Sequence, residues 1–215
     1  ELTDQLNTLS DSVDRDSDGL ADMGKDLEDR ARTAMSSLGV TYPELFGYYP
    51  QPKGLLFPAF LSVQNLSGIY SPFTIEANYN SAMVSYNLPF TICHELSHLR
   101  GFMQEEEANF IGFLACVSTD DTAFNYSGYL LGWIYATNEL YDTDYDTFEE
   151  IYSRLSDNVK ADLSANSSFW SRYDSKVAEV SGQINDHYLK ANGQSDGVKS
   201  YDRMVDLMIT WFRSK

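Results

Sequence analysis

The stretch that decides the fold is residues 91–116, which read TICHELSHLRGFMQEEEANFIGFLAC. It holds two of the three histidines, both cysteines and three consecutive glutamates of a 215-residue chain. Apolar residues flank the histidines at helical spacing, and Gly101 can end one helix and let the chain reverse into the next. The pattern predicts two helices, with the start of the second lying beside the histidines of the first.

The motif HELSH has the chemistry of a zinc site. His94 and His98 are four residues apart, so both lie on one face of a helix, from which two neutral imidazoles can hold Zn²⁺. Glu95 lies beside the first histidine, where it can take a proton from water without being a ligand. A buried helix with these three side chains needs a partner that satisfies them. The motif therefore predicts His94 and His98 as metal ligands and Glu95 as a general base.

A third protein ligand is expected among the three glutamates that open the second helix. Successive helical residues point about 100° apart, so only one of the three can face the metal. We predict Glu105, because Asn109 lies four residues further on the same face and can hold a ligand histidine through its side-chain amide. The other two glutamates are explained by the preference of acidic residues for helix N-termini.

Composition sets the class of protein and excludes some partners. The net charge is −17, which argues against nucleic acid and against anionic membrane surfaces as partners. The hydrophobic fraction of 43% favours a globular chain of one domain. No run of residues is apolar over the length that a membrane span needs. The oligomeric state has no signal in the sequence.

The fold class predicted is α+β and mainly helical, with a small β-sheet before the HExxH helix. Residues 68–80, GIYSPFTIEANYN, predict one or two strands, and Pro72 favours an edge strand. We expect residues 1–215 to form a single domain, with an N-terminal helical pair in 1–40 and a catalytic core in 41–215. Other helical patterns cover 1–14, 21–38, 126–141, 146–163, 167–190 and 198–213.

Two features of the chain have competing interpretations. Residues 14–22, DRDSDGLAD, fit the opening of a calcium loop, but Lys25 stands where a bidentate glutamate is needed, which favours a solvated turn. Cys93 and Cys116 lie at different helical distances from the turn between their helices, so direct pairing is disfavoured.

Four segments together resemble a known family. HELSH followed closely by EEEAN looks like the gluzincins, the zincin metallopeptidases whose third ligand is a glutamate in an ExxxD or ExxxN motif. More narrowly, GIYSPFTIEANYN, PFTICHELSHLRGF, EEEANFIGFLAC and YLKANGQSDGVKSY are similar to a bacterial family of zincin-like metallopeptidases known as a domain of unknown function. The spacing from the second histidine to the glutamate is shorter here than in the better-known gluzincins.

The resemblance implies a zincin-like fold, a Zn²⁺ cofactor and a peptide or protein substrate. It also implies a membrane-tethered protein whose N-terminal anchor is trimmed from this chain, acting at the extracytoplasmic face of a bacterial membrane. Zincins stabilise the oxyanion with a Tyr or His from the C-terminal part of the chain, for which Tyr201, then His187, are the candidates.

Two functions remain open. The first is a zinc-dependent peptidase that hydrolyses peptide bonds through a zinc-bound water, with Glu95 as general base. The second is a non-catalytic zincin-fold ectodomain that binds or senses peptide or cell-wall ligands. The presence of Glu95 favours the enzyme, because a binding module needs no base beside its metal ligands.

Overall fold

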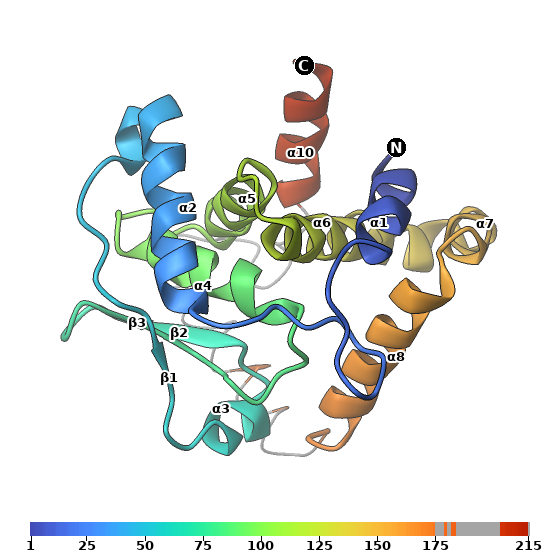
Figure 1. The fold of residues 1–215 in the computed structure, drawn as a ribbon, viewed down its shortest axis with the longest axis horizontal. Coiled ribbons are helices and arrows are strands. Elements are labelled where there is room, and N and C mark those ends of the chain that lie inside the picture. Colours follow the sequence, from blue (N-terminus) through green and yellow to red (C-terminus); the bar gives the residue numbers. More distant parts are fainter. Residues whose placement is uncertain (175–178, 180–181, 184–202, 215) are drawn as a thin grey trace.

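The computed structural model describes residues 1–174, 179, 182–183 and 203–214. This part of the chain is mainly helical with one three-stranded sheet, so the predicted α+β class is confirmed (Figure 1). The helices are α1 Leu2–Ser10, α2 Leu27–Thr41, the 3₁₀ turn η1 Pro43–Leu45, α3 Ala59–Val63, α4 Asn87–His98, α5 Glu105–Val117, α6 Thr122–Thr143, α7 Tyr145–Ser153, α8 Asp157–Ser171 and α10 Arg203–Arg213. The strands are β1 Lys53–Gly54, β2 Gly68–Ser71 and β3 Glu76–Tyr79.

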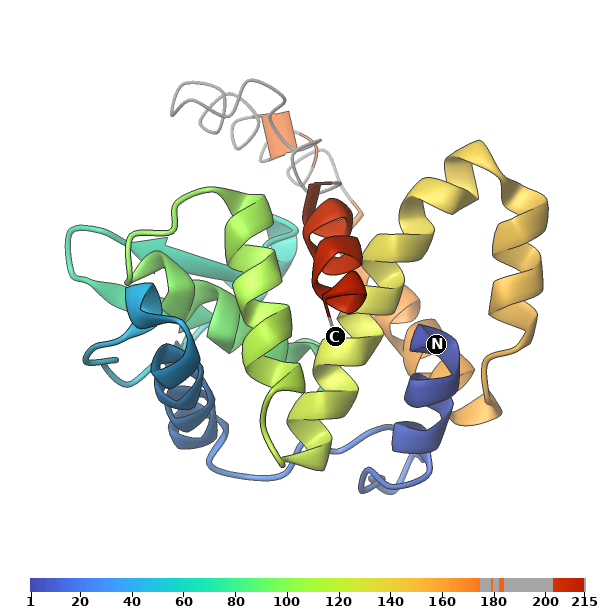
Figure 2. The ribbon, with the colours of Figure 1, turned by 90° about the horizontal axis from the view of Figure 1, so that it is seen from above.

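Helices α4, α5 and α6 form the centre of the molecule. The two predicted helices of residues 91–116 are confirmed as α4 and α5, and Gly101 lies between them with a φ of 93°. Helix α4 is buried on almost every side, with Phe90, Ile92 and Leu96 in the core. Helices α5 and α6 pack on α4 and on each other, and α10 lies against both α5 and α6 (Figure 2). The polar residues of α4 are therefore held inside the protein.

The small sheet has the strand order β1-β3-β2 and packs against α4. Strands β2 and β3 form an antiparallel hairpin in which Gly68 is opposite Tyr79 and Ser71 is opposite Glu76. Strand β1 is parallel to β3. Residues 68–80 form two strands, which confirms the expectation of one or two, and Pro72 lies in the turn that joins them. Within the described residues β2 is therefore an edge strand that pairs on one side, with β3.

The two N-terminal helices pack at different places on the central helices. Helix α1 lies against α6 and α8, whereas α2 lies against α4 and α5 (Figure 1). The expected helical range 21–38 is wrong at its start, because α2 begins only at Leu27. Residues before it form a bridge between Arg15 and Ala21, and Asp26 has a left-handed backbone with φ of 56°, which a helix cannot contain.

The C-terminal half also differs from the predicted ranges. The expected helix 146–163 is two helices, α7 and α8, and the Ser156 hydroxyl caps the second by accepting from the N–H of Val159. The expected helix 167–190 does not begin as a separate helix, because residues 167–171 are the end of α8. Residues 172–174 are not helical, and most of the remaining range lies outside the described residues. Within the residues described, no helix combines the length and apolar character that crossing a membrane requires.

Candidate metal centre

Three side chains converge at the junction of α4 and α5. His94, His98 and Glu105 each offer one ligand atom, and these atoms lie within 4.8 Å of one another. Nε2 of His94 is 3.1 Å from Nε2 of His98 and 3.3 Å from Oε2 of Glu105, and Nε2 of His98 is 3.7 Å from Oε1 of Glu105. Two nitrogens and a carboxylate that face one point are a donor set that suits Zn²⁺.

His98 is fixed in the tautomer that a metal ligand needs. Its Nδ1 is 2.7 Å from the backbone carbonyl oxygen of Phe102, and a carbonyl only accepts, so Nδ1 carries the hydrogen. Burial and the neighbouring His94 lower the pKa of His98 to about 4, so the ring is neutral at pH 7. Nε2 of a neutral ring protonated at Nδ1 has a free lone pair, and it points toward His94 and Glu105.

His94 has the electrostatic environment of a cation site. Burial acts to lower the pKa of His94, but the Glu105 carboxylate, followed by Glu95, outweighs burial and raises it. The direction of this pKa shift indicates that the Glu105 carboxylate attracts positive charge at His94, beside the lone pair of His98. A bound divalent cation would supply this positive charge, so the residues present fit a metal ion.

Glu95 is buried beside the three candidate ligands, and one of its oxygens has no hydrogen-bond partner. Glu95 is 4% exposed, and its Oε2 atom has no hydrogen-bond partner in the part of the chain that the structure describes. Burial raises the pKa of Glu95 to about 8. The charge of His94 opposes this shift, and the charge of Glu105 adds to it. A carboxyl group with such a pKa can exchange a proton near neutral pH.

Strand β2 runs directly past Glu95. A Cβ atom built on Gly68 would be 2.4 Å from Oε1 of Glu95, which is closer than any real Cβ contact. Only glycine allows the backbone of β2 to approach the carboxylate this closely. The next residue but one, Tyr70, has its ring centroid 6.0 Å from that of His98. The edge of the sheet therefore borders the candidate centre.

The structure places the three consecutive glutamates in different surroundings. Glu105 faces the histidines, as predicted. Glu106 is buried and points toward α10, with its Oε1 3.7 Å from Nη1 of Arg203. Glu107 is exposed. The 100° step between helical residues separates the three environments, so only Glu105 can join His94 and His98.

Asn109 and Tyr135 lie behind His94. The Asn109 side chain is buried beside His94 and contributes to raising the His94 pKa, although Nδ1 of His94 and Nδ2 of Asn109 form no hydrogen bond within the described residues. The hydroxyl of Tyr135, on α6, donates to Oδ1 of Asn109 at 3.2 Å. Sequence reasoning missed Tyr135, because no motif marks one tyrosine among fifteen.

The candidates for oxyanion stabilisation, Tyr201 and His187, lie outside the described residues.

The two cysteines both lie within the described residues. Cys93 and Cys116 are free and buried, and burial together with the hydrogen-bonded thiol of Cys93 raises the pKa of Cys116. The thiols therefore lie side by side between α4 and α5. The helical distances disfavoured a disulfide between the two cysteines, and both thiols are free, although the packing of α5 on α4 brings them close together.

The suggested calcium loop is organised by its own backbone. Oδ1 of Asp16 accepts from the N–H groups of Asp18 and Leu20, and Oδ1 of Asp22 accepts from Gly24. In the described residues the group of potential metal ligands is the histidine and glutamate cluster, not this loop. The solvated turn explains the segment.

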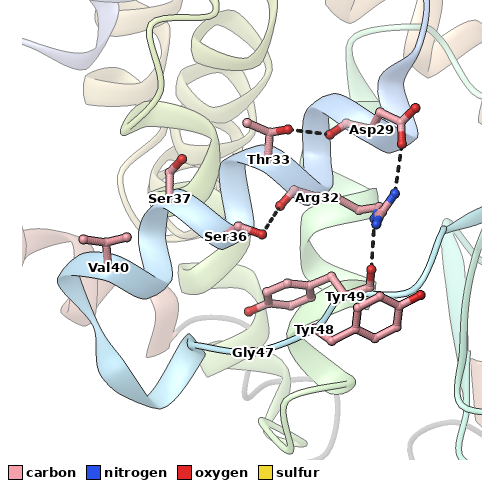
Figure 3. Close-up of a pocket in the computed structure, with 9 residues that line it drawn as sticks. All are labelled: Asp29, Arg32, Thr33, Ser36, Ser37, Val40, Gly47, Tyr48 and Tyr49. Atoms are coloured by element: carbon pink, nitrogen blue, oxygen red, sulfur yellow. Dashed lines mark hydrogen bonds and ion pairs between the residues drawn. The ribbon is translucent and has the colours of Figure 1, made fainter.

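A surface hollow of about 570 Å³ lies between α2 and residues 47–49 (Figure 3), and none of the candidate ligands lines it. Arg32 spans it, donating to the carbonyl of Tyr49 at 2.9 Å and to Asp29 at 3.0 Å. The charged groups of the hollow therefore satisfy one another. It contains none of the residues that the sequence singles out.

Comparison with known proteins places the chain in a family. Residues 1–209 match a family described as "Protein of unknown function (DUF3810)". Neither the curated proteins nor the solved structures contain a significant match to the chain. Because the match covers nearly all of the sequence, the chain belongs to the DUF3810 family of proteins of unknown function.

Proposed function

We propose that this protein is a zinc-dependent peptidase with a zincin-like fold. The observation that carries the proposal is the convergence of His94, His98 and Glu105 beside a buried, partly unsatisfied Glu95. Two histidines one helical turn apart, a glutamate from the following helix and a base next to the first histidine are the parts that zinc peptidases require. A sheet that packs on the HExxH helix supports the zincin-like architecture.

In this proposal His94, His98 and Glu105 hold the zinc ion. When bound, the ion polarises a water molecule and lowers its pKa toward neutrality. The tautomer of His98 is set by the Phe102 carbonyl, which keeps the Nε2 lone pair directed at the site. Glu95 receives a proton on its carboxylate and returns it to the leaving amine, a role for which a perturbed pKa is suited.

An extended substrate would pair with the free edge of β2. This edge borders the candidate centre, since Gly68 contacts Glu95 and Tyr70 lies beside His98. Backbone hydrogen bonds to an edge strand bind a peptide in an extended form without depending on its sequence. We place Tyr201, and after it His187, as candidates for stabilising the oxyanion, on the resemblance to zincins alone.

A second candidate is a non-catalytic zincin-fold ectodomain that binds or senses peptide or cell-wall ligands. The observation that favours it is burial, because the side chains of His94 and His98 are only 12% and 7% exposed. In both proposals the chain acts on the extracytoplasmic side of a bacterial membrane. The net charge of −17 is compatible with that location, and the resemblance is its main support.

Zinc content and hydrolysis measured on the same samples test the proposal. We expect about one zinc per chain in the wild type and in Glu95→Gln, and loss of zinc in Glu105→Ala. Glu106→Ala is the matched control, because it removes a neighbouring glutamate that faces α10. Peptide hydrolysis by Glu95→Gln should fall by roughly 10²–10⁴-fold, as expected when a general base is removed.

The outcomes separate the two candidates. Zinc binding without hydrolysis of any peptide by the wild type would favour the ectodomain. Full zinc content in Glu105→Ala would show that the ligand assignment is wrong.

A further inference from the structure

The free edge of β2 carries backbone groups that are available to another strand. Among the described residues β2 pairs with β3 alone. The N–H of Asn80 donates to the carbonyl of Ser67, which makes this a hydrogen-bonded pair of the antiparallel ladder. Such pairs alternate along the ladder, so the N–H and C=O groups of Gly68 and Tyr70 point away from β3. These are the two residues of β2 that border Glu95 and His98.

The side chains of β2 alternate between two faces. Gly68 and Tyr70 face α4 and the candidate centre, so Ile69 lies on the opposite face. Ile69 is 47% exposed. A peptide strand added to the edge would place one side chain beside Ile69, because neighbouring strands pair residues on the same face.

The segment of the chain that contains β2 carries no charged side chain, although Glu76 of β3 lies opposite Ser71. Residues 54–75 contain no Asp, Glu, Lys, Arg or His, although 22% of the chain is charged and its net charge is −17. The charged residues that flank this run, Lys53 and Glu76, form an ion pair with each other. Soluble proteins usually protect an exposed edge strand with charged side chains, lysine above all. Within the described residues β2 itself has no such protecting charge, which is the property of a strand that receives another strand.

We propose that β2 selects an uncharged, apolar stretch of peptide, and that Ile69 determines this preference. The inference rests on the proposed function, since it names the class of substrate that the same site would take. Exposed apolar side chains continue past the strand, with Phe73 at 97% exposed in the hairpin turn. The occupant is therefore an extended peptide with small or apolar uncharged residues.

Charge explains why acidic and basic peptides are disfavoured. The net charge of −17 repels acidic peptides at a distance. A basic peptide is attracted at a distance, but a lysine packed beside Ile69 would lose hydration. Residues 54–75 offer it no carboxylate, and the carboxylate of Glu76, opposite Ser71, is already paired with Lys53. Selectivity at β2 therefore comes from the cost of desolvating any charge.

Binding of labelled peptides to zinc-supplemented Glu95→Gln protein, measured by fluorescence anisotropy, tests this inference. The reference probe is an octapeptide of alanine, leucine, serine and threonine. In two matched probes the central two residues are both glutamate or both lysine, so that one of them faces Ile69 in either register. Both charged probes should bind at least about tenfold more weakly than the reference probe.

Substitution of Ile69 sharpens the test. Ile69→Glu should weaken binding of the reference probe about fivefold and strengthen binding of the lysine probe. Ile209→Glu is the matched control, because Ile209 has a similar exposure of 42% on α10, and it should change no affinity by more than about twofold.

Equal affinity for the three probes, no binding of any probe, or no effect of Ile69→Glu would overturn the inference. Hydrolysis of the three probes by the wild-type protein tests the proposed function separately from the selectivity. Preferential binding without cleavage would reject the peptidase and keep the selectivity. Cleavage of all three probes at equal rates would keep the peptidase and reject the selectivity.

Discussion

Two buried carboxylates of this protein have opposite surroundings. Asp162, on α8, is fully buried, and both of its carboxylate oxygens accept hydrogen bonds. It accepts from Nη1 of Arg15 at 2.8 Å, from the backbone N–H of Ala21 at 2.9 Å and from the hydroxyl of Tyr126. Glu95, on α4, is almost as buried, yet its Oε2 has no partner in the described part of the chain.

The difference distinguishes a carboxylate with a structural role from one for which we propose a function. Asp162 connects α8 to α6 and to the loop that follows α1, because its partners come from these elements. Burying a charge is tolerated when each oxygen is hydrogen-bonded and a cation is near. Glu95 lacks that compensation, and the raised pKa is the consequence. Buried groups without such compensation lower stability, and proteins retain them mainly at functional sites.

The largest effect is expected where the satisfied carboxylate is removed. Asp162→Ala leaves the mostly buried guanidinium of Arg15 without its counter-ion, so the free energy of unfolding should fall by about 3–5 kcal/mol. Urea denaturation followed by circular dichroism measures this. Asp157→Ala, at the exposed first residue of the same helix, is the control and should lower stability by no more than about 1 kcal/mol, the contribution of an acidic residue at a helix N-terminus. A small effect of Asp162→Ala would remove the distinction between the two carboxylates.

In metal-free protein, the pH dependence of the free energy of unfolding should reveal the raised pKa of Glu95. Its pKa is raised by burial from 4.5 to about 8, so the folded state keeps a proton that the unfolded state releases between these values. The stabilisation is complete below about pH 4.5 and is lost as pH rises through about 8. The wild type should therefore lose stability relative to Glu95→Gln across this window, by at most about 1.4 kcal/mol per pH unit.

Thermal unfolding of both proteins between pH 5 and 9, in the presence of a chelator, measures that difference. Glu107→Gln is the control at an exposed glutamate, and its difference from the wild type should not follow the same profile. A difference between the wild type and Glu95→Gln that is constant with pH would mean that Glu95 is not a perturbed carboxyl.

The smallest effect is expected for Tyr135, which lies behind the candidate ligand His94. Tyr135→Phe removes the hydroxyl that orients Asn109 beside His94, so zinc affinity should weaken by roughly tenfold, the lower end of what such supporting contacts contribute. Competition with a chromophoric chelator measures the affinity. Tyr129→Phe, on the same helix, is the control and should leave the affinity unchanged. Equal affinities in the two variants would exclude a positioning role for Tyr135.

Much of the local structure could be predicted from residue patterns. The turn at Gly101, the two helices around it and the strands of residues 68–80 follow from backbone preferences that act over a few residues. The start of α2 and the division between α7 and α8 were missed. Those boundaries depend on a β-bridge and on a serine cap, which helical periodicity does not register.

That His94 and His98 share a helical face, and that one of three glutamates can join them, follows from residue spacing, because the geometry of a helix is set locally. The surroundings of these side chains depend on how distant segments pack. The tertiary structure brought Gly68 against Glu95, Tyr135 onto Asn109 and the two thiols together. These contacts join residues far apart in the chain, and their physical origin is the packing of α5, α6 and β2 on α4, which no local pattern encodes.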